Sequence, residues 1–274
     1  MAQSALEACN AALIKLGEKT ITSLSDDVRS ASILNARYDN VKKSLLRMHP
    51  WNFACKRTNL EPTWATITGA AGDGSADNQI RITSATHGLS NGQRVTIRSV
   101  GGTTEADGTW IIGDKTTNTF DLVDSTFSNT YTSGGEWALA ATYGYAYSIA
   151  LPTDCIRVLR VNDSQLKPDW RIEGGRLLTD EDEVELKYVY DVTDYTTMPI
   201  DFYECLALYL AIDVCLPLTQ NDQRKAELRQ EFDRMLSKAR HSDATEDAAE
   251  ELEANEWIAS RYSSPAYRGF FSNI

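Results

Sequence analysis

Histidine is scarce in this sequence, and basic residues are outnumbered by acidic ones. The 274 residues include three histidines, and 27 Lys and Arg stand against 39 Asp and Glu, a formal net charge of −12. Proteins that recognise DNA or RNA by sequence usually present a basic surface, so this balance argues against a reader of that class. An acidic surface can instead allow DNA to pass without adhering to it.

Cysteines are few and scattered, and their number, five, is odd. They form neither a disulfide framework nor a C-x-x-C metal motif. Cys9, Cys205 and Cys215 lie in apolar helical patterns. We interpret them as small buried hydrophobic residues of a protein in a reducing compartment.

The sequence also lacks a leader and long apolar runs. The first residues, M-A-Q-S-A-L-E, carry no basic segment, and no stretch reaches the roughly 18 consecutive apolar residues of a membrane span. We therefore expect neither a signal peptide nor a transmembrane segment.

Motifs of catalysis and metal binding are missing as well. The acidic run Asp180–Glu183 lacks the ligand spacing of a calcium loop, and Gly69–Gly74 lacks the Lys-Ser/Thr of a phosphate-binding loop. We interpret them as a solvated turn and a loop. His49, His87 and His241 are not grouped by any pattern. The expectation is a protein without metal, cofactor or catalytic residues, although a pair of carboxylates that become close in space is not visible in a sequence.

The first sixty residues predict two helices. Ser4 and Glu7 form a capping box before an apolar stripe that ends at Gly17. A second helix is predicted over residues 30–48, capped by Ser25 and stopped by Pro50. Its one-sided apolar stripe needs other helices to cover it. The stripe consists of Ala31, Leu34, Tyr38, Val41, Leu45 and Met48.

Residues 62–139 differ in composition from the segments before them and are rich in Gly, Thr, Ser, Asn and Asp. Short alternating runs predict strands, and Gly-rich turns separate them, among them Gly134-Gly135. We therefore predict a compact all-β module. Its predicted strands are residues 80–83, 94–97, 109–112 and 119–122.

The second half predicts a small sheet and then helices again. Strands are expected at 155–161 and 183–189, with a hairpin around Gly174-Gly175 between them. A helix that is apolar almost all round follows Pro199 and is expected to end at Pro217. After an Asn221/Asp222 cap comes an amphipathic helix. From Asp243 we expect an extended tail, first acidic and then aromatic.

This order predicts an α+β fold, a helical bundle with a small antiparallel β unit and an inserted all-β domain. Residues 1–61 and 140–242 would form the helical core with its small sheet, residues 62–139 the inserted domain, and residues 243–274 the extended C-terminal tail.

Several segments resemble one known family. Residues 5–27, A-L-E-A-C-N-A-A-L-I-K-L-G-E-K-T-I-T-S-L-S-D-D, and His49–Ala54, H-P-W-N-F-A, are similar to the tail tubular protein A and head-to-tail adaptor family of tailed phages. So are Leu151–Leu159, Ile172–Asp180 and Leu186–Tyr190. The likeness covers about residues 1–61 and 140–240. Residues 62–139 depart from the simplest members and resemble a small β domain that recurs in phage virion proteins, through Ile82-Thr83, His87-Gly88-Leu89, Gly108-Thr109-Trp110 and Phe120-Asp121-Leu122.

The resemblance implies a structural protein of the virion, assembled in the host cytoplasm and not an enzyme. Such proteins form a ring, commonly of twelve subunits, below the portal protein of the capsid. The ring binds a downstream tail or nozzle protein, and DNA passes through its lumen without specific binding. The sequence leaves two alternatives open: a host-surface or glycan-binding tail component acting through the β insert, and a wall-degrading hydrolase.

The tail is the predicted portal-binding site. Its aromatic residues follow neither a helical nor a strand period, and exposed aromatic side chains on such a segment need a partner to cover them. We expect them to anchor the tail on the portal, with two arginines as polar contacts. These residues are Trp257, Arg261, Tyr262, Tyr267, Arg268, Phe270 and Phe271.

Overall fold

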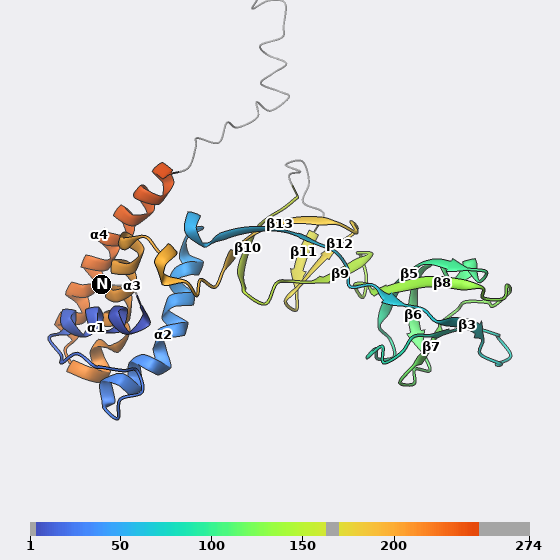
Figure 1. Cartoon of the computed structure of the whole chain (residues 1–274), viewed down its shortest axis with the longest axis horizontal. Helices are drawn as coiled ribbons and strands as arrows, with labels where there is room; N and C mark the ends of the chain where they lie inside the picture. Colours follow the sequence, from blue (N-terminus) through green and yellow to red (C-terminus); the bar gives the residue numbers. More distant parts are fainter. Residues whose placement is uncertain (1–3, 163–169, 247–274) are drawn as a thin grey trace, which may run out of the picture.

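The computed structural model describes residues 4–162 and 170–246. This part of the chain is α+β, with four α-helices and three antiparallel sheets. The helices lie at one end, a seven-stranded sheet at the other, and two three-stranded sheets between them (Figure 1). The chain leaves the helices, reaches the seven-stranded sheet, and returns through the middle sheets to the last two helices.

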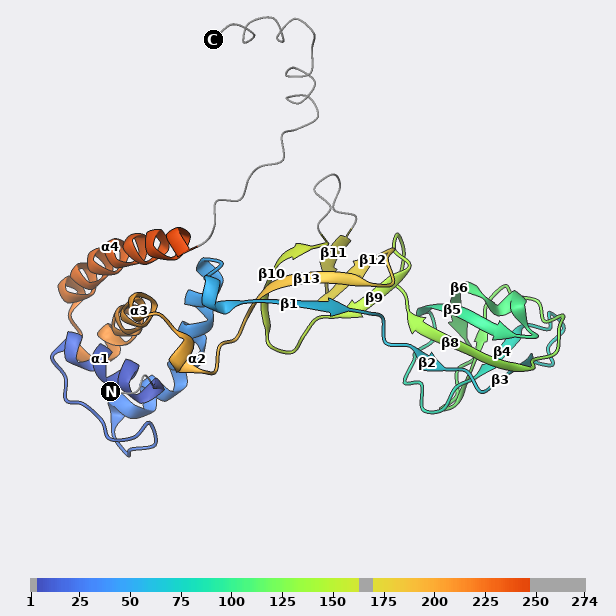
Figure 2. The same ribbon diagram turned by 45° about the horizontal axis from the view of Figure 1, so that its top comes forward.

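The helices are α1 (Ala5–Leu16), α2 (Arg29–Met48), α3 (Ile200–Thr219) and α4 (Asp222–Glu246). Helix α3 contacts each of the other three and lies among them (Figure 2). Phe202, Leu206 and Leu210 on α3 are fully buried in a hydrophobic core that all four helices share. A helix that is apolar almost all round is expected to be the buried one, and 11 of the 20 residues of α3 are buried.

Local signals set the helix boundaries, with one exception. The Ser4 hydroxyl accepts a hydrogen bond from the Glu7 amide at 3.2 Å, and Gly17 ends α1 in the left-handed conformation, both as predicted. The predicted Ser25 cap is wrong, because α2 begins after Val28 without a side-chain cap. The carboxylate of Asp26 instead accepts bonds from the preceding Thr22 and Ser23 amides and so shapes the turn before the helix.

Most of the predicted stripe of α2 is buried, but two residues differ. Met48 is 39% exposed, whereas Lys42, expected outside the stripe, is only 3% exposed. The Lys42 ammonium lies 2.8 Å from the Asp191 carboxylate and donates to the Val192 carbonyl at 3.0 Å. These partners follow the middle sheet in sequence, so the buried charge links α2 to the segment that leads into α3.

The ends of α3 and α4 also differ from the prediction. Pro217 lies inside the last turn of α3, which continues to Thr219 and ends at Gln220 in the left-handed conformation. The proline removes the amide that would bond to the Asp213 carbonyl, and the helix ends two residues later, at Thr219. Helix α4 continues to Glu246, and the first four residues of the predicted tail, from Asp243, are therefore helical.

Within the described residues, α3 is the one helix long and apolar enough to cross a membrane on length and composition alone. In this structure 61% of its apolar window is buried inside the protein. Its apolar side chains thus have protein partners, which is compatible with the prediction of no membrane span.

Two small sheets form the middle of the molecule. One contains β1 (Cys55–Leu60), β13 (Val184–Tyr190) and β10 (Cys155–Val161), with β13 in the centre. The other contains β9 (Tyr147–Ala150), β12 (Arg176–Thr179) and β11 (Trp170–Glu173). The predicted alternation of β13 is confirmed, since Val184, Leu186 and Tyr188 are buried in one cluster. The hairpin at Gly174-Gly175 is confirmed as β11–β12.

The seven-stranded sheet has its own hydrophobic cluster. The four strands predicted from alternation are present within β4, β5, β6 and β7. The sheet order is β2 (Ala65–Thr66), β8 (Ser133–Leu139), β5 (Arg94–Gly101), β6 (Gly108–Gly113), β7 (Thr119–Leu122), β4 (Ile80–Thr83) and β3 (Gly69–Gly72).

Glycine explains two wrong predictions in this sheet. Gly69–Gly74 was expected as a loop but contains β3, and Gly134-Gly135 was expected as a turn but lies in β8. A Cβ added to Gly135 would lie 2.9 Å from Cγ2 of Val100 on the neighbouring strand. The glycine therefore allows a close approach of β8 to β5, which a turn-based interpretation misses. Short 3-10 helices occur at Asn52–Ala54 (η1), Thr104–Ala106 (η2) and Tyr195–Thr197 (η3).

Candidate interaction surfaces

The described residues include no cluster that could bind a metal ion. No set of three or more His, Cys, Asp or Glu side chains in residues 4–162 and 170–246 could hold a metal ion. His49 contacts Asp243 beside the helices at 3.0 Å, whereas His87 contacts the Thr119 carbonyl in the seven-stranded sheet. Burial raises the pKa of the Cys9 and Cys205 thiols to about 12, so neither forms a reactive thiolate near neutral pH.

The acidic run Asp180–Glu183 is exposed, as expected of a solvated turn, and it also connects elements. Each of its four carboxylates has a hydrogen-bond or ion-pair partner, and these partners come from both the middle sheets and the seven-stranded sheet. The predicted solvated turn is thus also a polar joint between the two parts. The contacts are Asp180 with the Ala146 amide (2.8 Å), Glu181 with Asn162, Asp182 with Arg98 (3.5 Å) and Glu183 with Asn59 (3.1 Å).

Arg98 on β5 extends this joint. Its guanidinium lies 3.6 Å from the centroid of the Trp64 ring and pairs with Glu136 at 2.7 Å. The Trp64 ring in turn packs edge-on against Tyr147 of β9, with centroids 5.8 Å apart. Aromatic and charged contacts together therefore hold the seven-stranded sheet against the middle sheets.

A second joint lies where α4 ends. The Asp243 carboxylate accepts a hydrogen bond from the Asn52 amide at 3.0 Å and contacts His49, and the Asn52 side chain donates to the Asp243 carbonyl at 2.8 Å. Asp243 is 7% exposed. Next to it the buried Trp51 ring packs against Phe202 of α3, with centroids 5.1 Å apart. The last turn of α4 is thereby held beside the start of β1.

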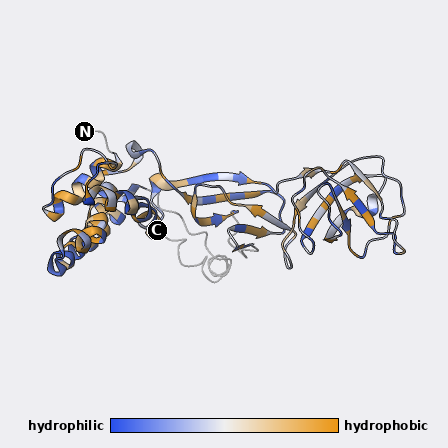
Figure 3. Cartoon of the chain, turned by 90° about the horizontal axis from the view of Figure 1, so that it is seen from below, coloured by the Kyte–Doolittle hydropathy of each residue, from blue (hydrophilic) through white to orange (hydrophobic). Residues whose placement is uncertain are grey.

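Three basic residues form a row across the sheet β1-β13-β10. Arg57 on β1 pairs in register with Lys187 on β13, which pairs in turn with Arg160 on β10. Register partners in a sheet lie on the same face, so the three side chains are neighbours. Figure 3 shows hydrophilic stretches along the strands of this middle part. We call Arg57, Lys187 and Arg160 the basic row.

The basic row lines a surface groove of about 260 Å³. Glu185 and Asn162 also line the groove. Arg57 is exposed, and Lys187 and Arg160 are half-buried. Within the part of the chain that the structure describes, the side chains of Arg57 and Lys187 make no hydrogen bond or ion pair. The groove is thus a positively charged site on an acidic protein.

A larger hollow of about 460 Å³ lies where the seven-stranded sheet meets β9, β11 and β12. Tyr143 and Tyr145 line it together with Arg94 and Arg171. Tyr143 is 80% exposed. Aromatic faces beside charged groups in a hollow are suited to a polar, ring-shaped ligand.

The predicted portal-binding residues lie outside the described part of the chain. Nothing in the structure tests their role. They are Trp257, Arg261, Tyr262, Tyr267, Arg268, Phe270 and Phe271.

Sequence reasoning did not find the basic row. Its members are separated by 103 and 27 residues, and only the pairing of β1 and β10 with β13 makes them neighbours. The alternation of β13 places Lys187 on the polar face, but no local pattern indicates its partners. Comparison with protein-family models and with curated proteins finds no match for this chain.

Proposed function

We propose that this protein is a structural subunit of a tailed-phage virion, a head-to-tail adaptor like tail tubular protein A, and not an enzyme. Subunits form a ring, commonly of twelve, below the portal protein. The ring binds the downstream tail or nozzle protein, and DNA passes through its lumen.

The observation that carries the proposal is the use of the family-like segments as structural joints. In L-P-T-D-C, the Asp154 carboxylate accepts from Lys56 at 2.8 Å and from the Tyr188 hydroxyl of L-K-Y-V-Y at 3.1 Å. In H-P-W-N-F-A, Trp51 is buried in the helical core and Asn52 holds Asp243. Residues that join elements are what an assembly protein needs, whereas a catalytic family would place reactive side chains in its motifs.

The architecture supports the division into a helical bundle and an inserted β domain. The chain enters the seven-stranded sheet at β2 and leaves it at β8, and these strands pair directly, Ala65 with Trp137. Adjacent chain ends are what insertion of one domain into another requires. In the proposed ring, α2, α3 and α4 form the wall, through head-to-tail contacts that close a circle.

The charge supports a channel that does not retain DNA. A net charge of −12 in each subunit gives a ring a strongly negative field. Such a field repels phosphates, so the duplex stays mobile in the lumen.

The test is the mass of the protein alone and with a portal ring, by light scattering and electron microscopy. We expect a ring in at least the portal-bound sample. A stable monomer that does not bind portal would contradict the adaptor proposal. The fold as described would be unaffected.

The hollow beside Tyr143 favours a second candidate, a host-surface or glycan-binding tail component acting through the β insert. Two tyrosines and two arginines around about 460 Å³ suit a sugar ring with acidic substituents. A glycan array tests this candidate. The glycan-binding candidate would be favoured over the adaptor if the protein forms no ring with portal and binds a glycan, and if Tyr143→Ala abolishes that binding.

A further inference from the structure

The basic row is unfavourable for the sheet that carries it. Arg57, Lys187 and Arg160 lie on adjacent strands in one register, and like charges directly opposite each other destabilise a sheet. Strands in a sheet are about 4.8 Å apart, so three positive charges fall within roughly 10 Å. An anionic partner beside Arg57 and Lys187 would offset this repulsion.

Arg157 extends the positive region towards the helices. It pairs in register with Val189, two residues beyond Lys187, and therefore lies on the same face as the basic row. Arg157 is exposed, and its guanidinium donates to the Arg47 carbonyl at 3.4 Å, near the end of α2. The positive region therefore runs from the sheet to the end of α2.

The described part of the chain ends close to this region. Asp243, in the last turn of α4, contacts Asn52, and β1 begins three residues later at Cys55 (Figure 2). The chain continues beyond Glu246 for another 28 residues, 247–274. An extended segment spans up to roughly 3.3 Å per residue, so ten residues reach about 33 Å, more than the length of β1.

The first ten of these residues have the complementary charge. Residues 247–256 read D-A-A-E-E-L-E-A-N-E, and they include no Lys or Arg. The five acidic residues are Asp247, Glu250, Glu251, Glu253 and Glu256.

We propose that residues 247–256 dock on the basic row of the same subunit, with their carboxylates on Arg57 and Lys187. The contact places the start of the aromatic segment, residues 257–271, beside the middle sheet. Glu185 also lines the groove and repels carboxylates, so we place the acidic side chains on Arg57 and Lys187.

Charge complementarity and chain length favour this occupant over DNA. The groove of about 260 Å³ suits a few side chains, whereas a duplex would also bring its phosphates against a protein of net charge −12. The inference does not depend on ring formation, because one subunit can make the contact alone. A negative result in the portal experiment above would therefore leave this proposal standing, and a negative result in the experiment below would leave the adaptor proposal standing.

Zero-length carbodiimide coupling of the full chain tests the proposal, because it joins an amine to a carboxylate only where the two are in contact. Mass spectrometry is expected to find Lys187 linked to Glu250, Glu251 or Glu253. Screening by 1 M salt should lower the yield about fivefold or more, as should Arg57→Glu, which leaves the Lys187 amine in place.

Lys19→Glu is the matched control, because it reverses an exposed charge on the loop after α1. It should leave the yield unchanged. The milder variant Arg57→Gln, with a thermal melt of each protein, separates loss of docking from loss of folding.

Three results would overturn the proposal. One is the absence of a cross-link between Lys187 and the tail, or a cross-linking yield that changes neither with salt nor with Arg57→Glu. Another is a link that forms only between copies in a mixture of isotope-labelled and unlabelled protein. The third is binding of a short DNA duplex that is lost in Arg57→Glu but is unchanged when the five tail acids are neutralised.

Discussion

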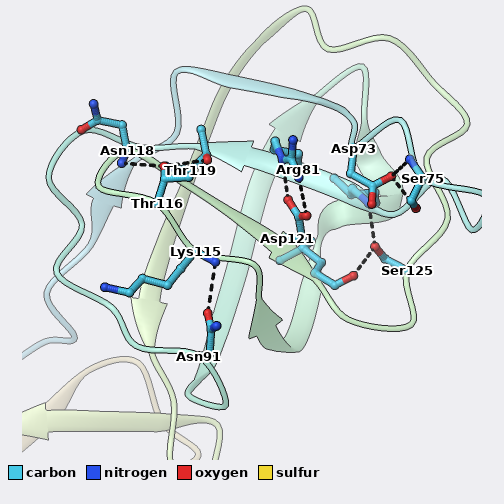
Figure 4. A network of polar contacts seen from close by, with 12 residues as sticks. Asp73, Ser75, Arg81, Asn91, Lys115, Thr116, Asn118, Thr119, Asp121 and Ser125 are labelled. Atoms are coloured by element: carbon cyan, nitrogen blue, oxygen red, sulfur yellow. Dashed lines mark hydrogen bonds and ion pairs between the residues drawn. The ribbon is translucent and has the colours of Figure 1, made fainter.

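Arg81 and Asp121 show how a single pair supports the seven-stranded sheet. They are register partners on β4 and β7, and two hydrogen bonds of 2.7 Å join the guanidinium to the carboxylate (Figure 4). The Asp121 side chain is 2% exposed, whereas that of Arg81 is 39% exposed. The acid is therefore buried and depends on one partner that reaches in from the surface.

Replacing Arg81 should be costly because the Asp121 charge would lose its partner. We expect Arg81→Ala to lower the free energy of unfolding by about 2–3 kcal/mol, somewhat less than the roughly 3–5 kcal/mol of a fully buried pair. Urea denaturation followed by tryptophan fluorescence measures it. Lys115→Ala, at an exposed lysine of the same unit, is the control and should change little. Equal stability of both variants would contradict the prediction.

Glu105 gives the β unit a dependence on pH. Burial raises the pKa of its carboxyl, but hydrogen bonds from the Asn129 and Ser128 amides outweigh this and lower it to about 2. An unfolded glutamate has a pKa of about 4.3. Since the folded value is the lower one, the stabilisation is complete above about pH 4.3 and is lost as the pH falls towards 2.

Glu105→Gln should therefore lower the melting temperature at pH 7, and the difference from the unmodified protein should shrink at pH 2–3. Differential scanning calorimetry across this range measures it. Glu18→Gln, at an exposed acid outside the β unit, serves as the control. A difference that stays constant with pH would show that the carboxylate bonds are not its cause.

At the scale of elements, β2 and β8, the first and last strands of the seven-stranded sheet along the chain, pair directly with each other. Replacing residues 65–139 by a short Gly/Ser linker should leave the helices and middle sheets folded, because the linker spans only neighbouring strands. Circular dichroism and the cooperativity of thermal unfolding check this. Loss of the cooperative transition would show that the β unit belongs to the core of the remaining protein.

The contacts at the junction need a separate control. The Thr96 hydroxyl of β5 donates to the Ala146 carbonyl at 2.7 Å, and the deletion removes this bond along with the sheet. The variant Thr96→Val removes the bond alone. The stability that Thr96→Val loses is the share of the deletion's effect that comes from this contact. Any further loss in the deletion variant comes from the missing unit.

Elements with a strong local period were predictable from the sequence. The stripe of α2 and the alternation in β13 each reflect one buried face, and the Ser4 and Gly17 caps of α1 satisfy terminal backbone groups. Strand β1, with the sequence C-K-R-T-N-L, has no apolar alternation, because it lies at a sheet edge, where three of its six residues are exposed and none is fully buried. Its existence depends on pairing with β13, and the register partners are 124 residues apart at Leu60 and Val184 and 134 apart at Cys55 and Val189, so no local pattern indicates it.

The candidate sites were less predictable than the elements. The acidic run Asp180–Glu183 was found, but its partners come from four other segments. The continuation of α4 to Glu246 was missed because its last turn is polar, and Asp243 is buried only through contact with His49 and Asn52. Long-range pairing, and not local propensity, decides these positions.

At the scale of the whole molecule, the end of α4 decides how the tail should be tested. Truncation after Arg240 would also remove Asp243 and its contacts with Asn52, so it would weaken the helical core. Truncation after Glu246 keeps them. We expect this shorter protein to keep a cooperative melt but to bind portal at least about tenfold more weakly, because the aromatic anchors are gone.

Sedimentation with portal rings measures the affinity, and a melt of each truncated protein is the control. The variant that ends at Arg240 should melt at a lower temperature than the one that ends at Glu246. Unchanged portal affinity in the protein that ends at Glu246 would remove the tail from the proposed portal interface.

Strand β1 also has a mechanical consequence. It carries the chain from the helices towards the seven-stranded sheet, and six registered pairs attach it to the antiparallel β13, through which the chain returns to the helices. Tension between the two ends of the molecule is therefore shared by an outgoing and a returning backbone path. The pairing of β1 with β13 holds these two paths side by side, so a load on one strand passes to the other through the hydrogen bonds between them.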